Sequence, residues 1–238
     1  SELRDVASRT LQRGGKLIIP SFAVGRTQEI VYNLHRMIDA RDIPRVPVFV
    51  DSPLAVNASD IFKKHRECFD DETWEFMNNG THPALDFNGL TYIRNLEESK
   101  QLNTRKDPMV IISASGMAET GRILHHLKNN IEDKRSTIVI VSWQAPHTLG
   151  RRLAEQEERI KIFGEVFYRQ ADVVTIGGLS AHAGQDMLVE YAQAAQAHKH
   201  GIFLVHGEER GALPLKAKLQ ENGHHKVFYP ELHQSLEI

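Results

Sequence analysis

The sequence contains almost no cysteine and has no long apolar run. Cys68 is the only cysteine among 238 residues, so no disulfide can form within the chain, and nothing favours an oxidising compartment. No apolar stretch approaches the roughly 20 residues that a membrane-spanning helix needs. The N-terminus also lacks the basic and then apolar pattern of a signal peptide. We therefore expect a cytoplasmic protein that does not act in a membrane.

An excess of positive charge is also absent. Lys and Arg together number 29 and Asp and Glu number 31, which gives a formal net charge of −2. This balance excludes a protein that binds nucleic acid through overall positive charge, although a local basic patch can still attract phosphate. With 41% hydrophobic and 25% charged residues, the composition is that of a globular protein and excludes disorder and collagen.

Short apolar runs alternate with amphipathic stretches, which is typical of strand–helix–strand units around a parallel sheet. The pattern predicts helices after strands at residues 16–23, 48–50, 109–114 and 137–141. From about residue 160 the runs become shorter, which suits an antiparallel or mixed sheet. A helix, a strand, a second helix and a final strand are expected after residue 185. We place a domain boundary near residue 170 and predict a loop-rich excursion at residues 71–108.

Small and polar residues follow four of these strands. In parallel sheets, ligands bind at the carboxyl ends of the strands, where backbone amides and helix N-termini are exposed. The loops could therefore hold phosphate, with Arg26, Arg122, Arg151 or Arg152 supplying charge. The alternative is that their glycines and serines only end strands and cap helices. None of these loops is a Walker motif or a GxGxxG motif, so a nucleotide cofactor has no support.

Thirteen histidines are present, and two of them stand at expected strand ends. His182 lies among small residues before a helix, and His206 follows the apolar residues 201–205. A neutral imidazole at a strand end is suited to bind a metal ion, although a hydrogen-bonded structural histidine is an equal alternative for each. Glu29 is a candidate acidic partner that could prepare a histidine to act as a general acid. A solvent-exposed surface role is expected for most of the others, which include His35, His65, His125, His126, His198, His200, His224 and His225.

Six segments carry a family resemblance over nearly the whole chain. They are IPSFAVGRTQE (19–29), DSPLA (51–55), SASGM (113–117), TLGRRL (148–153), GLSAHA (178–183) and VHGE (205–208). In this order they resemble the β-CASP family of RNA-processing metallo-β-lactamase nucleases, which includes bacterial and archaeal homologues of the mRNA 3′-end-processing endonuclease. The resemblance implies a β-CASP domain at residues 1–170, with a mainly parallel, Rossmann-like α/β sheet flanked by helices. It implies that residues 171–238 are the C-terminal part of a metallo-β-lactamase αββα core.

The resemblance also implies roles for individual residues. Glu29 would hold His182, which would protonate the leaving oxygen, and His206 would bind zinc. DNA-directed members usually lack the histidine matched by His206, so RNA is the implied substrate. The family's cleft between its two domains must thread the strand, which favours single-stranded RNA over duplex. The family has two zinc ions in its site, and analogy with it allows a homodimer. The residues implied to bind RNA or phosphate are Ser21, Arg26, Ser113, Ser115, Gly116 and Arg151.

One family motif is missing from the sequence. Most zinc ligands of the family come from HxHxDH, which does not occur here, and the chain starts at Ser1, where the β-CASP domain would start. We therefore expect a fragment of a zinc-dependent ribonuclease that lacks an N-terminal metallo-β-lactamase half. Because a catalytic zinc ion needs about three protein ligands, we expect the chain alone to bind no zinc and to be inactive. Endonuclease and 5′ exonuclease modes both stay open for the intact protein.

Two other functions remain as alternatives. The first is a non-catalytic RNA-binding or scaffold subunit of the same family. The second, which the sequence favours least, is a small-molecule hydrolase or a Rossmann-like nucleotide-binding protein.

Overall fold

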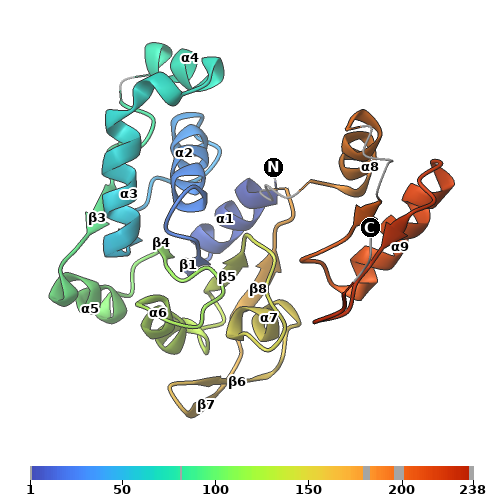
Figure 1. The fold of residues 1–238 in the computed structure, drawn as a ribbon. Coiled ribbons are helices and arrows are strands. Elements are labelled where there is room, and N and C mark those ends of the chain that lie inside the picture. Colours follow the sequence, from blue (N-terminus) through green and yellow to red (C-terminus); the bar gives the residue numbers. More distant parts are fainter. Residues whose placement is uncertain (1, 81, 179–182, 196–200, 236–238) are drawn as a thin grey trace. The chain divides into compact units, whose positions relative to one another are not determined.

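The computed structural model describes residues 2–80, 82–178, 183–195 and 201–235, and Figure 1 traces their path. The chain divides into two compact units, Ser1–Ser180 and Ala181–Ile238. No helix within the described ranges combines the length and the apolar character needed to cross a bilayer.

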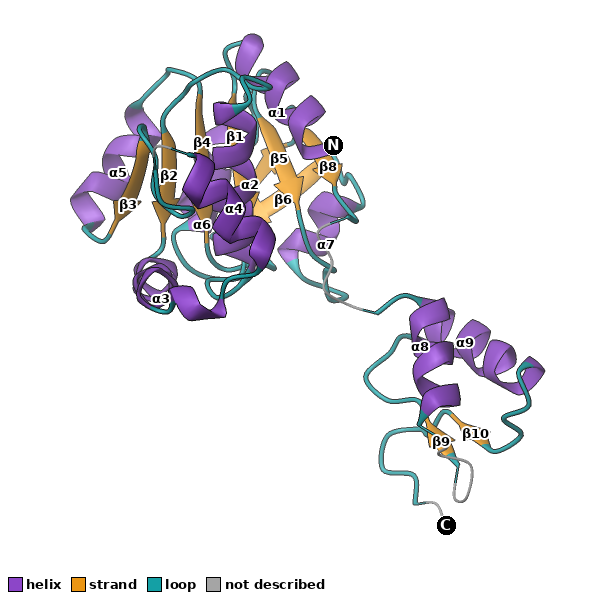
Figure 2. Ribbon diagram, turned by 90° about the horizontal axis from the view of Figure 1, so that it is seen from above, coloured by secondary structure: helices purple, strands orange, loops and turns teal. Residues whose placement is uncertain are grey.

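The first unit is built on a six-stranded sheet with the strand order β3-β2-β4-β1-β5-β8. Every strand pair in this sheet is parallel. The strands are β1 (Lys16–Pro20), β2 (Val48–Asp51), β3 (Leu90–Ile93), β4 (Met109–Ser113), β5 (Thr137–Ile140) and β8 (Asp172–Thr175). Helices flank the sheet in Figure 2. The predicted α/β class with a mainly parallel, helix-flanked sheet is thus confirmed.

Helices cover both faces of the sheet, and the central strands β1, β2, β4 and β5 are therefore buried at every position and mostly apolar. Alternate residues of β1 enter opposite cores, with Leu17 and Ile19 in one and Ile18 in the other. The first core includes side chains from α1 (Glu2–Gln12), α2 (Arg26–Asp39) and α3 (Pro53–Lys64). The second includes side chains from α5 (Leu96–Thr104), α6 (Ile123–Asn130) and α7 (Leu149–Ala154). Because all strand pairs are parallel, the loops that follow β1, β2, β4 and β5 share the carboxyl edge of the sheet.

The prediction of a loop-rich excursion at residues 71–108 is wrong. This region contains α4 (Asp71–Asn79), the edge strand β3 and α5. Both helices are nine residues long, and only Ile93 of β3 is buried. Such short, largely exposed elements carry little hydrophobic periodicity, which is the main sequence signal for secondary structure. The side chains of Asp70 and Asn95 cap the two helices by accepting backbone N–H bonds.

The prediction of solvent-exposed histidines is wrong for three positions. His35 in α2 and His126 in α6 have 0% relative exposure, and His224 has 8%. The Nδ1 atom of His35 lies 3.1 Å from the carbonyl oxygen of Ala84, and its ring stacks on Phe87. Burial lowers the pKa of His35. Charged neighbours in the sequence are misleading here, because side chains adjacent along a helix point in different directions.

The remaining elements are a hairpin and the second unit. Strands β6 (Arg159–Ile162) and β7 (Glu165–Tyr168) pair antiparallel, as the short runs predict. The second unit contains α8 (Gln185–Ala194), β9 (Ile202–Phe203), α9 (Glu209–Glu221) and β10 (Val227–Phe228). A 3-10 turn, η1 (Arg66–Cys68), separates α3 from α4. Because β8 joins the large sheet, the compact units divide after residue 180. The domain boundary predicted near residue 170 stays a prediction.

Truncation of a buried side chain in β4 tests whether the sheet is packed into a core on both of its faces. Ile111 lies in β4 with 0% exposure, and Ile111→Ala should lower the free energy of unfolding by about 2 to 5 kcal/mol because it leaves a cavity. The matched control is Ile61→Ala in α3, where the side chain is 58% exposed and the loss should stay below about 1 kcal/mol. Urea denaturation measures both. Equal losses in the two variants would contradict this packing.

Candidate functional site

The six residues predicted to bind RNA or phosphate lie at one edge of the first unit. They occur at the carboxyl ends of the neighbouring strands β4, β1 and β5 or at the starts of the helices that follow. The six are Ser21, Arg26, Ser113, Ser115, Gly116 and Arg151.

Two of these residues connect the strand ends to one another. The backbone N–H of Ser21 donates to the carbonyl oxygen of Ser113 (3.0 Å), and the Ser113 hydroxyl donates to the carbonyl oxygen of Asp51 (2.7 Å). The Ser21 hydroxyl accepts a hydrogen bond from the Thr27 hydroxyl (3.1 Å). With 0% and 1% exposure, Ser21 and Ser113 are buried. They hold the ends of β1, β2 and β4 together, and their role in phosphate binding stays a prediction.

The loop after β4 turns tightly around Ser115 and Gly116. The Ser115 hydroxyl oxygen accepts the backbone N–H groups of Glu119 (3.1 Å) and Thr120 (3.3 Å). A Cβ on Gly116 would lie 2.9 Å from the backbone nitrogen of Phe22 and 3.0 Å from its ring. The side-chain amide of Gln144 donates to the Gly116 carbonyl (3.1 Å). Loops from three neighbouring strands therefore meet at Gly116, where a side chain would separate them.

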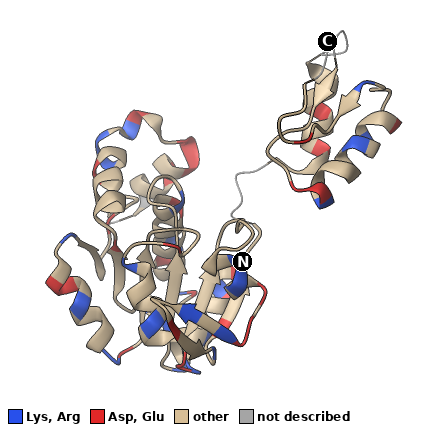
Figure 3. Ribbon diagram, turned by 60° about the horizontal axis from the view of Figure 1, so that its bottom comes forward, with Lys and Arg blue, Asp and Glu red and all other residues tan. Residues whose placement is uncertain are grey.

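The two arginines of the predicted site already have carboxylate partners. Arg26 forms an ion pair with Glu29 within the first turn of α2. Arg151 pairs with Glu155 and also points toward the carbonyl oxygen of Gln144, with Nη1 at 3.5 Å. In Figure 3, Lys and Arg are interspersed with Asp and Glu along the ribbon. Ion pairs with an exposed partner contribute little stability, so a phosphate group can compete for either guanidinium at small cost.

Of the predicted pair of Glu29 and His182, only Glu29 lies within the described residues. Glu29 is exposed at the N-terminal turn of α2, where the helix dipole favours a negative charge. His182 lies outside the described residues, so its pairing with Glu29 stays a prediction. In the second unit, His206 follows β9 with a positive φ of 61° and an exposed side chain. It lines a cavity of about 720 Å³ whose walls include Phe203 and Leu215.

A complete metal site does not occur in the part of the chain that the structure describes. No three His, Cys, Asp or Glu side chains converge there. Because a catalytic zinc ion needs about three protein ligands, a zinc ion on His206 would require ligands from other residues. The described residues alone therefore do not fit zinc.

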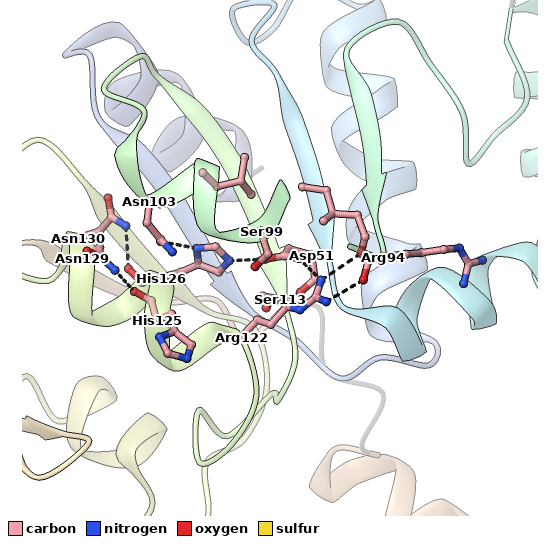
Figure 4. A network of polar contacts seen from close by, with 12 residues as sticks. Asp51, Arg94, Ser99, Asn103, Ser113, Arg122, His125, His126, Asn129 and Asn130 are labelled. Carbon is pink, nitrogen blue, oxygen red and sulfur yellow. Dashed lines mark hydrogen bonds and ion pairs between the residues drawn. The ribbon is translucent and has the colours of Figure 1, made fainter. Parts of the chain in front are cut away.

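A buried ionic network lies beside the Gly116 loop and was not predicted. Asp51 ends β2 with 0% exposure. Its Oδ2 accepts hydrogen bonds from the Ser99 hydroxyl and from His126 Nε2, both at 2.6 Å. Its Oδ1 accepts one from Arg122 Nη1 at 2.7 Å. Figure 4 shows these donors converging on the carboxylate. We call these four residues the Asp51 cluster.

The Asp51 cluster has a structural role and is not a catalytic triad. In a serine hydrolase the serine hydroxyl bonds to the histidine, whereas Ser99 donates to the carboxylate directly. Asp51 and His126 are also closed to solvent. Burial by itself raises the pKa of Asp51, but hydrogen bonds from His126, Ser99 and Arg122 outweigh it and keep the pKa below its ordinary value. The carboxylate thus stays charged and links β2 to α5 and α6.

Sequence reasoning singled out Asp51 as part of a strand-end loop but missed its buried role. A carboxylate at the end of an otherwise apolar strand is a signal for burial, and a buried carboxylate needs charged or hydrogen-bonding partners. Those partners come from helices much later in the chain, so the sequence does not indicate which residues they are.

Two family models match the chain. A model described as the Beta-Casp domain matches residues 27–153, which contain the Gly116 loop and the Asp51 cluster. A model described as the Zn-dependent metallo-hydrolase RNA specificity domain matches residues 169–230, which contain His206.

Several curated proteins are similar to the chain. Ribonuclease TTHA0252 of Thermus thermophilus is 37% identical over 222 residues, which cover 93% of this chain and 50% of that protein. Transcription termination factor FttA of Methanosarcina mazei is 30% identical over 91% of this chain and 35% of its own length. An RNase J-like protein of Methanocaldococcus jannaschii is 30% identical over 89% of this chain and 48% of its own length. The chain thus spans from about a third to half the length of these relatives.

Replacement of the buried carboxylate tests the Asp51 cluster. Asp51→Asn should lower the free energy of unfolding by about 3 to 5 kcal/mol, because it leaves Arg122 without its buried counter-charge. Asp60→Asn is the matched control: it removes an ion pair with Arg94 whose side chains are 49% and 51% exposed, and it should cost less than about 1 kcal/mol. Chemical denaturation compares the two. If both variants lose the same stability, the cluster does not stabilise the fold.

The pH dependence of unfolding supplies a second test. The pKa of folded Asp51 lies below its ordinary value of 3.8, so the unfolded chain takes up this proton first as the pH falls. The stabilisation by Asp51 is therefore complete above pH 5 and is lost as the pH falls through the folded pKa, within about pH 5 to pH 1. Over this window the free energy of unfolding should fall less steeply in Asp51→Asn than in the wild type. Identical slopes would show that Asp51 does not contribute.

Proposed function

This chain belongs to the β-CASP family, and from that premise we propose that it is part of a zinc-dependent ribonuclease that hydrolyses phosphodiester bonds of single-stranded RNA. The observation that supports this proposal most is the meeting of three strand-end loops at Gly116, inside the match at residues 27–153. Loops of this kind at the carboxyl edge of a parallel sheet are suited to bind phosphate. A relative named ribonuclease supports the reaction class.

In this proposal the chain supplies the RNA clamp and a proton donor. Arg26 and Arg151 bind phosphate groups beside the Gly116 loop, exchanging their carboxylate partners for the substrate. His182 donates a ring N–H proton to the leaving oxygen, and Glu29 holds the imidazole in position. The exposure of Glu29 on the first turn of α2 supports this role, because an exposed carboxylate can accept a hydrogen bond from an imidazole.

Zinc belongs to the proposal as the cofactor of the intact protein. When bound, it would neutralise the negative charge that develops on the phosphate during cleavage. His206 is the proposed ligand from this chain. Since the described residues offer no further ligands around it, we assign no step of the reaction to zinc within this chain. The cytoplasmic location and a homodimer likewise remain proposals.

A non-catalytic RNA-binding or scaffold subunit is the second candidate. What distinguishes it from a nuclease is whether other parts of the intact protein supply zinc ligands in addition to His206. The name of the relative from Methanosarcina mazei, transcription termination factor, also allows a role other than RNA decay.

Replacement of the two histidines in the full-length protein tests the proposal. His182→Ala should reduce the rate of cleavage of a single-stranded RNA by about 100-fold or more while zinc content stays unchanged. His206→Ala should reduce both cleavage and zinc content, measured by gel assay and metal analysis. The control is His65→Ala, which alters an exposed histidine paired with Glu67 and should change neither. An unchanged rate in His182→Ala would refute its role as proton donor, and a wild type that binds zinc and RNA without cleavage would favour the scaffold subunit.

A further inference from the structure

Two large aromatic side chains are exposed at the carboxyl edge of the sheet. Phe22 follows β1 and is 42% exposed, and Trp143 follows β5 and is 47% exposed. Strands β1 and β5 are neighbours in the sheet. Aromatic residues bury a large area when they pack into a core, so their exposure on two adjacent loops requires an explanation.

Phe22 is held outward by its neighbours. Ser21 and Ala23 are buried with 0% and 9% exposure. The Phe22 carbonyl oxygen accepts hydrogen bonds from both the hydroxyl (2.8 Å) and the backbone N–H (3.2 Å) of Thr27. One side of the ring rests against Gly116. This loop cannot turn Phe22 inward without breaking those bonds.

Trp143 is held in a comparable way. The next residue, Gln144, is only 4% exposed. Its side-chain amide donates to the carbonyl oxygens of Gly116 (3.1 Å) and Ser142 (3.0 Å). With Gln144 anchored inward, Trp143 stays on the outside of the loop. Both aromatic residues therefore project from loops that contact the same glycine.

Two arginines follow Trp143 in the chain, and each is paired with a carboxylate: Arg151 with Glu155 and Arg152 with Glu157. Residues 142–152 contain Arg151 and Arg152 but no Asp or Glu. Arg151 Nη1 lies 3.5 Å from the carbonyl oxygen of Gln144, which places a guanidinium next to the aromatic loop. Apolar rings beside a cation suit a ligand that combines flat rings with negative charge. A single-stranded nucleic acid has both, in its bases and its phosphates.

We propose that Phe22 and Trp143 are stacking platforms for the bases of single-stranded RNA, while the Gly116 loop and Arg151 bind its phosphates. This inference rests on the proposed RNA substrate and adds the way in which the strand is recognised. Every base has a π-face, so stacking of this kind tolerates any sequence. A base-paired strand keeps its bases stacked on one another, so the platforms select single strands over duplexes.

The test compares two oligomers that differ only in their bases. The probes are a fluorescein-labelled 12-nucleotide oligo(A) RNA and an abasic strand of the same length, with EDTA present to prevent cleavage by the full-length protein. Trp143→Leu and Phe22→Leu should each weaken oligo(A) binding by about 5-fold to 150-fold. Binding of the abasic strand should change less than about twofold in either variant, because it contributes only phosphates. The control is Phe163→Leu, which alters a 52% exposed aromatic residue between β6 and β7 and should change neither affinity.

Tryptophan fluorescence gives a second readout that leaves both platforms intact. The chain contains two tryptophans, and the other, Trp74, lies in α4. In a full-length protein whose tryptophans elsewhere are replaced by Phe, including Trp74→Phe, oligo(A) should quench Trp143 emission at the concentrations at which it binds. The abasic strand should not quench it.

The outcomes separate this inference from the proposed function. If oligo(A) and the abasic strand bind equally and oligo(A) leaves Trp143 emission unchanged, the stacking proposal is wrong and phosphate binding stands. If neither strand binds, the RNA proposal itself fails. Weaker oligo(A) binding in both platform variants, with abasic binding unchanged and Trp143 quenched, supports stacking.

Discussion

The parallel pairing of β1 with β4 is the constraint on which the rest of the first unit depends. It aligns Ile18 with Ile111 and Pro20 with Ser113, although these segments lie far apart in the chain. Because all six strands run in one direction, every strand-end loop emerges at the same edge. The helices that cover both faces leave this edge as the place where polar groups can gather without breaking the core.

The carboxyl edge of the sheet combines buried, hydrogen-bonded residues with exposed aromatic side chains. The Asp51 cluster contains a buried, charged carboxylate, which is tolerable because Ser99, His126 and Arg122 all donate hydrogen bonds to it. Gly116 has no side chain, which lets the loops that follow β1, β4 and β5 approach one another closely. Loops anchored in this way can hold exposed side chains in fixed positions, which limits the conformational entropy lost when a ligand binds. Phe22 and Trp143 have this kind of support.

Much of the fold could be predicted from the sequence because buried parallel strands are continuous apolar runs. The strands at residues 16–20, 48–51, 109–113 and 137–140 lie where those runs predict them. The segment from residue 71 to 108 could not be predicted in this way, since α4, β3 and α5 are short and mostly exposed. The burial of His35 was missed for a related reason, because it depends on the side of α2 that faces Phe87 and not on its neighbours in the sequence.

The sequence by itself determined the strand–helix alternation, the loops that end the strands and the motifs that place the chain in its family, because each is local to a short segment. Only the tertiary structure decided which distant residues meet. It brought Asp51 to Arg122 and His126, and it set the loops of Phe22 and Trp143 against the same glycine. The physical reason is that burial and pairing depend on neighbours in space, and these are fixed by the strand order of the sheet rather than by the order of the chain.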